Sequence, residues 1–119
     1  MRSTRLLIVA TVVVLFLALG GFLIAKNVGG GGQSRTFDLK VTGTTMTPDQ
    51  ITAKQGDRLT VNVTADKKEE IQLHGYDIPF EVANAGDKVT KTFKADKSGS
   101  FEIEIEDTST HLGELDVNP

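Results

Sequence analysis

The chain of 119 residues contains no cysteine. Without a thiol it can form neither a disulfide framework, nor a thiolate nucleophile, nor a cysteine-ligated zinc or iron–sulfur centre. A small domain without such cross-links depends on its hydrophobic core alone for stability. The core is therefore expected to be regular and well packed.

The sequence also lacks the motifs that accompany common catalytic mechanisms. The glycine run at residues 29–32 is not followed by the Lys-Ser/Thr pair of a phosphate-binding loop. The densest carboxylates, at residues 102–106, alternate with apolar residues and should face water, whereas a general acid usually needs an apolar pocket that raises its pKa. We expect a protein that is not an enzyme.

Residues 6–25 form a long uncharged segment in which only Thr11 carries a hydroxyl group. As a helix, these residues would span roughly 30 Å, the thickness of the hydrocarbon core of a bilayer. Arg2 and Arg5 precede the segment, and a short basic N-terminus normally stays in the cytoplasm. Residues 1–26 are therefore expected to be a signal anchor, a single transmembrane helix in the cell membrane. It would hold the C-terminal domain on the extracytoplasmic side, in the periplasm or outside the cell.

A cleaved signal peptide is the alternative for this segment. Residues 18–20, Ala-Leu-Gly, would serve as the cleavage site. The apolar stretch is longer than the ~7–15 residues typical of the hydrophobic part of a signal peptide, which favours retention as an anchor.

Composition and charge change after the apolar segment. Residues 27–34 are glycine-rich and are expected to be a flexible linker, followed by a folded domain at residues 35–119. All 16 Asp and Glu but only 10 of the 13 Lys and Arg follow residue 32, so that part of the chain has a net charge near −6. Such a domain is not expected to bind nucleic acid or anionic lipid head groups. The expected partner is the membrane, through residues 6–25, and no particular protein partner is indicated.

Apolar and polar residues alternate along several segments of the expected domain. In residues 37–41, 59–63 and 101–105 every second side chain is apolar. A repeat of two is typical of β-strands with one buried and one exposed face. Turn-forming sequences separate these segments, at residues 55–57, 66–68, 85–87 and 96–99. The pattern predicts an all-β domain, a Greek-key β-sandwich of seven or eight strands.

The inward-facing members of these segments form the expected core. They are Phe37, Leu39, Val41, Leu59, Val61, Val63, Ile71, Leu73, Val89, Phe93, Phe101, Ile103, Ile105, Leu115 and Val117.

Four stretches also resemble a known superfamily in their order and spacing. They are residues 46–57 (MTPDQITAKQGD), 59–63 (LTVNV), 98–105 (SGSFEIEI) and 112–117 (LGELDV). Together they resemble the cupredoxin superfamily, the fold of blue-copper proteins and of the copper domain of cytochrome oxidase subunit II. The resemblance covers nearly all of residues 35–117 and implies a Greek-key β-sandwich.

A narrower resemblance concerns the stretch His-Gly-Tyr-Asp at residues 74–77, followed by Gly-x-Phe-Glu-x-Glu-x-Glu at residues 99–106. This pair is similar to that of a group of membrane-anchored bacterial cupredoxin-like proteins that lack the blue-copper cysteine.

The departures from the superfamily pattern bear on function. The resemblance implies that His74 stands at the first histidine ligand, Ile105 at the copper-binding cysteine, and His111 near the axial methionine. A blue-copper centre needs two imidazoles and a thiolate. Because the thiolate is missing, blue-copper electron transfer is not expected.

The two histidines are nevertheless the residues best suited to bind a metal. In one interpretation, His74 and His111 meet in space and bind Cu(II) or another divalent ion, with oxygen ligands from Asp77, Glu106 or Asp107. In the other, His74 forms a hydrogen bond within its loop and His111 is an exposed loop residue. Two histidines 37 positions apart form no ligand-spacing motif. The sequence leaves both interpretations open.

Glu102, Glu104 and Glu106 share one face of their predicted strand because they alternate with apolar residues. One interpretation is a solvated outer face, paired across the sheet with Lys91 or Lys94. The other is a patch that binds a cation or a protein partner.

From these features we expect a non-enzymatic, membrane-tethered, extracytoplasmic cupredoxin-like domain that binds copper or another divalent metal weakly through His74. The candidate metal ligands are His74, His111, Asp77 and Glu106, and no catalytic or organic-cofactor residue is expected. The alternative is a metal-free protein-interaction or accessory module of a membrane complex.

Replacing Ile103 with Asp should unfold the domain, because the substitution would bury an unpaired charge. The measurement is a thermal melt of the variant. A melting curve that matches that of the parent would contradict the assignment of this strand.

Overall fold

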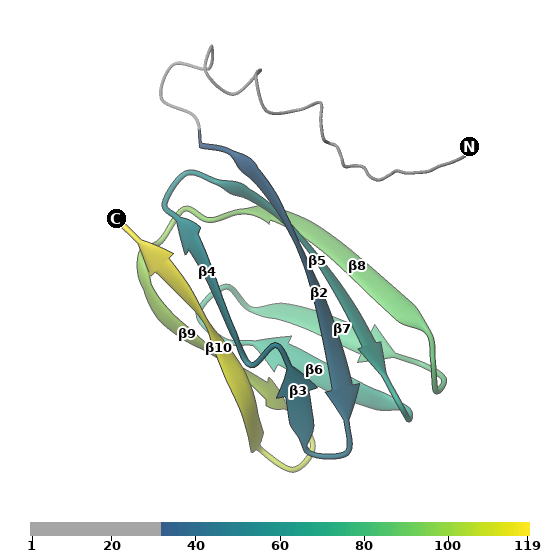
Figure 1. Ribbon diagram of the computed structural model, residues 1–119. Helices are drawn as coiled ribbons and strands as arrows, with labels where there is room; N and C mark the ends of the chain where they lie inside the picture. Colours follow the sequence, from purple (N-terminus) through teal and green to yellow (C-terminus); the bar gives the residue numbers. More distant parts are fainter. Residues whose placement is uncertain (1–31) are drawn as a thin grey trace, which may run out of the picture. The chain divides into compact units, whose positions relative to one another are not determined.

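The computed structural model describes residues 32–119 (Figure 1). The expected membrane-spanning segment at residues 6–25 and most of the expected linker lie outside these residues. Within the described part of the chain, no helix is long and apolar enough to cross a membrane. Arg35–Pro119 form one compact unit.

Two β-sheets make up this unit. The five-stranded sheet has the order β4 (Gln50–Lys54), β10 (Thr110–Asn118), β9 (Gly99–Ile105), β6 (Glu69–Leu73) and β7 (Ile78–Val82). The four-stranded sheet has the order β3 (Thr45–Thr47), β2 (Ser34–Thr42), β5 (Arg58–Ala65) and β8 (Lys88–Lys94). Strand β10 runs parallel to β4 and antiparallel to β9. One hydrophobic cluster contains residues of both sheets, so the fold is a β-sandwich (Figure 1).

The all-β sandwich expected from the alternating segments is confirmed, but the described residues contain nine strands rather than seven or eight. Two strands that the alternating segments did not predict lie within residues 45–54. They are the three-residue β3 and the five-residue β4, which belong to different sheets. Strand β7 contains Pro79 and lies at the edge of its sheet, where a missing backbone donor is tolerated.

Most of the expected core is buried between the sheets. Four of its members are only partly buried and pack against the cluster, namely Phe37, Val89, Phe93 and Phe101. Residues outside the clear alternating segments complete the core, and these are Met46, Ile51, Ala53, Ala65, Phe80, Val82, Ala95 and Leu112.

One charged pair ties β2 to the turn between β4 and β5. Asp57 is 1% exposed, and its Oδ2 accepts hydrogen bonds from Arg35 Nε at 2.5 Å and from the backbone amide of Lys54 at 2.9 Å. This pairing offsets the cost of burying the Asp57 carboxylate, so Arg35 fixes the start of the folded unit.

The bulge in β10 requires a glycine. The register of β10 against β9 shifts between His111 and Gly113, and a β-carbon at Gly113 would lie 2.1 Å from the carbonyl oxygen of Asp49. That oxygen accepts a hydrogen bond from the amide of Glu114 at 3.0 Å, so the contact cannot be relieved without weakening the link between β4 and β10.

Gly113→Ala should therefore lower the free energy of unfolding by about 3 kcal/mol, the upper end of typical overpacking costs. Chemical denaturation measures this loss. Gly43→Ala is the matched control, because nothing lies within 4 Å of its added methyl group. Its cost should be only about 1 kcal/mol, from its left-handed backbone. Equal losses for the two variants would show that the β10 bulge tolerates a side chain.

Candidate metal site on the five-stranded sheet

Strand β9 places two carboxylates on the outer face of the five-stranded sheet. Ile103 and Ile105 are 3% and 5% exposed and belong to the core. Because side chains alternate along a strand, Glu102 and Glu104 face the other way. The side chain of Glu104 is 14% exposed and that of Glu102 is 43% exposed.

His74 follows β6 and lies beside these carboxylates. Its backbone amide donates a hydrogen bond to the carbonyl oxygen of Glu102 at 2.9 Å, which extends the pairing of β6 with β9 by one residue. The imidazole Nε2 lies 2.8 Å from Oε2 of Glu104, and the side chain of His74 is 43% exposed.

The turn after His74 is held by aromatic packing. Gly75 has a φ of 86°, and a β-carbon there would lie 2.3 Å from the ring of Phe101. Tyr76 packs edge-on against the same ring, with centroids 4.8 Å apart, and its hydroxyl donates a hydrogen bond to the carbonyl oxygen of Lys97 at 2.7 Å. The chain therefore leaves β6 in one defined direction, which fixes the position of His74.

His111 reaches the same face because of the β10 bulge. Leu115 and Gly113 are buried, so an uninterrupted alternation would also turn His111 inward. The bulge adds one residue, Leu112 is buried instead, and His111 faces outward. Its Nδ1 lies 2.9 Å from Oε2 of Glu102, and its side chain is 63% exposed.

The site therefore joins two imidazoles and two carboxylates. Ligand atoms of His74, Glu102 and Glu104 all lie within 4.8 Å of one another, and Glu102 links this group to His111.

Of the four candidates from the sequence, His74 alone belongs to the compact ligand group within residues 32–119. His111 lies outside that group and contacts one of its members, Glu102. Asp77, an exposed residue of the turn with a φ of 55°, is not a member of the compact ligand group within residues 32–119, and neither is Glu106. In the sequence, Glu102 and Glu104 were interpreted either as a solvated face or as a patch that binds a cation or a protein partner, without a link to the histidines. Their role as neighbours of the histidines depends on strand register, which the sequence does not display.

The expected pairing of these glutamates with lysines is wrong. Lys91 and Lys94 lie on β8, where they pair with Val61 and Arg58 of β5 in the other sheet. The partners of Glu102 and Glu104 are the two histidines instead.

The carboxylates raise the pKa of His74 above its ordinary value of 6.5. The hydrogen bond to Glu104 is the largest cause, and the charges of Glu104, Glu102 and Glu106 act in the same direction, while burial opposes them. A metal ion at Nε2 would have to displace the proton that these carboxylates favour.

The residues present do not fit a blue-copper centre. The resemblance placed His74 and Ile105 around one copper, but Ile105 pairs with Ile71 and lies in the core. His74 lies on the outer face, opposite Glu102. The two positions therefore do not converge, and the chain has no cysteine.

No known protein family matches the sequence, and no curated protein is significantly similar to it. Solved structures do match. A laccase from Botrytis aclada aligns with a TM-score of 0.62 and 22% identity over 75% of this chain, but over only 23% of the laccase. The chain thus spans less than a quarter of that enzyme.

Two small copper proteins match along nearly their whole length. One is a copper-binding protein solved in its apo form, with a TM-score of 0.59, 15% identity, and coverage of 74% of this chain and 97% of that protein. The other is auracyanin A, a blue copper protein from Chloroflexus aurantiacus, with a TM-score of 0.58, 13% identity, and coverage of 71% and 99%. At these identities the likeness establishes the fold, which is cupredoxin-like, and the absence of cysteine sets this chain apart from blue-copper proteins.

Glu104→Gln should lower the pKa of His74, because it removes the carboxylate that makes the largest contribution to the shift. The measurement is the titration of the His74 ring protons by NMR.

The same pKa determines a pH dependence of stability. Because the folded pKa lies above 6.5, this interaction stabilises the fold fully below pH 6.5 and is lost as the pH rises through the folded pKa. In Glu104→Gln, denaturation curves recorded across this pH range should no longer show the loss of stability that this hydrogen bond causes. An unchanged His74 titration in the variant would contradict the assigned hydrogen bond.

Proposed function

We propose that this cupredoxin-like domain is a non-enzymatic, membrane-tethered, extracytoplasmic module that binds a divalent transition metal, copper foremost, at His74, Glu102, Glu104 and His111. The observation that carries the proposal is the compact group of ligand atoms, within 4.8 Å of one another, from His74, Glu102 and Glu104.

The donor set agrees with this class of metal. Imidazole nitrogens together with carboxylate oxygens suit Cu(II), Zn²⁺ or Ni²⁺, and a tetragonal arrangement of nitrogen and oxygen favours Cu(II). The exposed position of His111 and the proton held by His74 both argue for weak rather than very tight binding. The solved structures that share the fold include copper proteins, which adds support for copper.

The location is supported by the sequence alone. An uncharged stretch at residues 6–25, preceded by Arg2 and Arg5 and followed by four glycines at residues 29–32, is what a signal anchor and a tether require. The domain would then meet metal ions outside the cytoplasm.

A metal-free interaction module is the second candidate, because the outer face of the five-stranded sheet is acidic. Glu70 of β6 and Glu81 of β7 are directly paired, and Glu114 of β10 is paired with Glu102 of β9. Such a face is complementary to a basic partner.

Titration of the full chain with Cu(II), followed by electron paramagnetic resonance, separates the two candidates. We expect one bound ion per chain with nitrogen hyperfine structure. His74→Ala and Glu104→Gln should each weaken binding by about tenfold or more, as loss of a ligand typically does.

Glu81→Gln is the matched control, since it removes a carboxylate from the same sheet outside the ligand group, and it should bind copper as the parent does. Copper binding that is absent, or indifferent to His74, would contradict the metal site and leave the interaction module as the function.

A further inference from the structure

Glu69, the first residue of β6, is a buried carboxylate without a partner. It shares the inward face of the strand with Ile71 and Leu73 and is 8% exposed. Its Oε2 is buried and has no hydrogen-bond partner. Burial raises its pKa, and the charges of Asp66 and Asp107 add to the effect while Lys67 opposes it. An unpaired carboxylate in this position destabilises the fold, so its presence needs an explanation other than packing.

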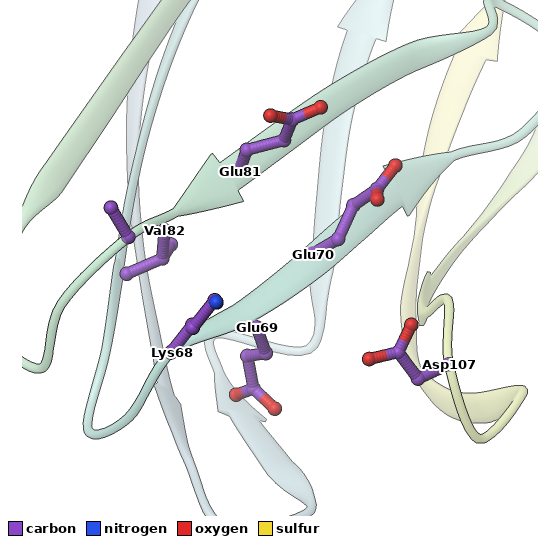
Figure 2. Close-up of a pocket in the computed structure, with 7 residues that line it drawn as sticks. Lys68, Glu69, Glu70, Glu81, Val82 and Asp107 are labelled. Carbon is purple, nitrogen blue, oxygen red and sulfur yellow. The ribbon is translucent and has the colours of Figure 1, made fainter.

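A pocket of about 400 Å³ lies beside this carboxylate (Figure 2). Four acidic side chains line it, Glu69, Glu70, Glu81 and Asp107, together with Lys68. Figure 2 shows the carboxylates of Glu70 and Glu81 on one side of their strands, Glu69 on the other side of β6, and Asp107 reaching toward β6 from the turn after β9. The wall between them includes the apolar residues Val82 and Ala83.

The negative charges of the pocket are only partly offset, by Lys68 in its lining and by the charge of Lys67 near Glu69. Glu70 and Glu81 are direct cross-strand partners, an arrangement in which like charges repel. Within residues 32–119, none of the four acidic side chains forms an ion pair or a side-chain hydrogen bond. A positively charged guest beside Glu69 would give this carboxylate a counter-charge.

The shape of the site favours an organic cation over a metal ion. The four carboxylates do not form a compact ligand group, because the group found within the described residues is the one around His74. The pocket is also much larger than a single ion and combines carboxylates with an apolar wall. An ammonium group on a short alkyl chain matches both features, with its charge toward Glu69 and its methylene groups against the exposed Ala83.

We propose that this pocket binds an alkylammonium group, supplied either by a free diamine or by a lysine side chain of a basic polypeptide, and that Glu69 is its main anionic anchor. This site is separate from the histidine site and does not depend on metal binding there.

The test is an NMR titration of the full chain, kept in solution with a mild detergent, at neutral pH and physiological ionic strength. The probes are 1,5-diaminopentane and N-acetyl-lysine methylamide, with 1-pentanol as an uncharged control. We expect saturable shifts of the backbone amides of Val82, Ala83 and Asp107 with both ammonium probes and none with pentanol. The probe that binds more tightly identifies a free diamine or a lysine side chain as the source.

Variants separate specific binding from general attraction to an acidic surface. Glu69→Gln should weaken binding of the ammonium probes by about tenfold or more. Glu114→Gln on β10 is the control and should leave the affinity for the ammonium probes unchanged. His74→Ala should leave this affinity unchanged as well. Shifts that do not saturate, or that weaken equally in Glu69→Gln and Glu114→Gln, would overturn the proposal. If Ca²⁺ gives saturable shifts and the ammonium probes do not, the proposed class of ligand, an alkylammonium group, is wrong.

Thermal stability is a second measurement on Glu69. The variant Glu69→Gln should lose affinity for the ligand but gain stability without it. Without ligand, Glu69→Gln should melt at a higher temperature than the parent, because it removes an unpaired buried charge. Diaminopentane should raise the melting temperature of the parent and not that of the variant. A variant that is less stable than the parent and still binds the diamine would show that Glu69 has a structural role only.

Discussion

The alternation of side chains along β9 is the constraint on which the rest of the structure depends. Burial of Ile103 and Ile105 between the sheets forces Glu102 and Glu104 to the outer face. Strand β9 lies between β6 and β10, so each glutamate meets a histidine from a neighbouring segment, His74 just after β6 on one side and His111 of β10 on the other. The hydrophobic effect thus positions the polar site, since removing the two isoleucines from water is worth several kcal/mol.

The acidic groups of the five-stranded sheet are poorly explained by stability. An exposed contact such as that of His111 with Glu102 contributes at most about 0–1 kcal/mol. The unpaired oxygen of Glu69 costs about 1–3 kcal/mol by comparison with other buried unsatisfied groups. Together these charges add little or nothing to the free energy of folding, which favours a role in binding cations. The two proposals place two kinds of cation on one sheet, a metal ion at the histidines and an organic ammonium group beside Glu69.

Period-two alternation made the long strands, the turns between them and most of the core predictable. It could not reveal β3, which has only three residues, or β4, where one of the two inward residues is the small Ala53. It also missed β7, where Pro79 obscures the pattern although Phe80 and Val82 are buried. The sequence also identified both histidines. Their carboxylate partners were not predictable, because they depend on the register of β6 against β9 and on one extra residue in β10 that turns His111 outward. Local sequence fixes which face a side chain occupies within one strand, whereas contacts between strands require the register.

The central claim is that a metal ion binds where the outer faces of β6, β9 and β10 meet. Anomalous diffraction at the copper edge, from crystals soaked in Cu(II), tests it most directly because it locates the ion. The account predicts a peak within bonding distance of Nε2 of His74 and of a carboxylate oxygen of Glu104. A peak elsewhere, or none at a copper concentration that saturates binding in solution, would contradict it.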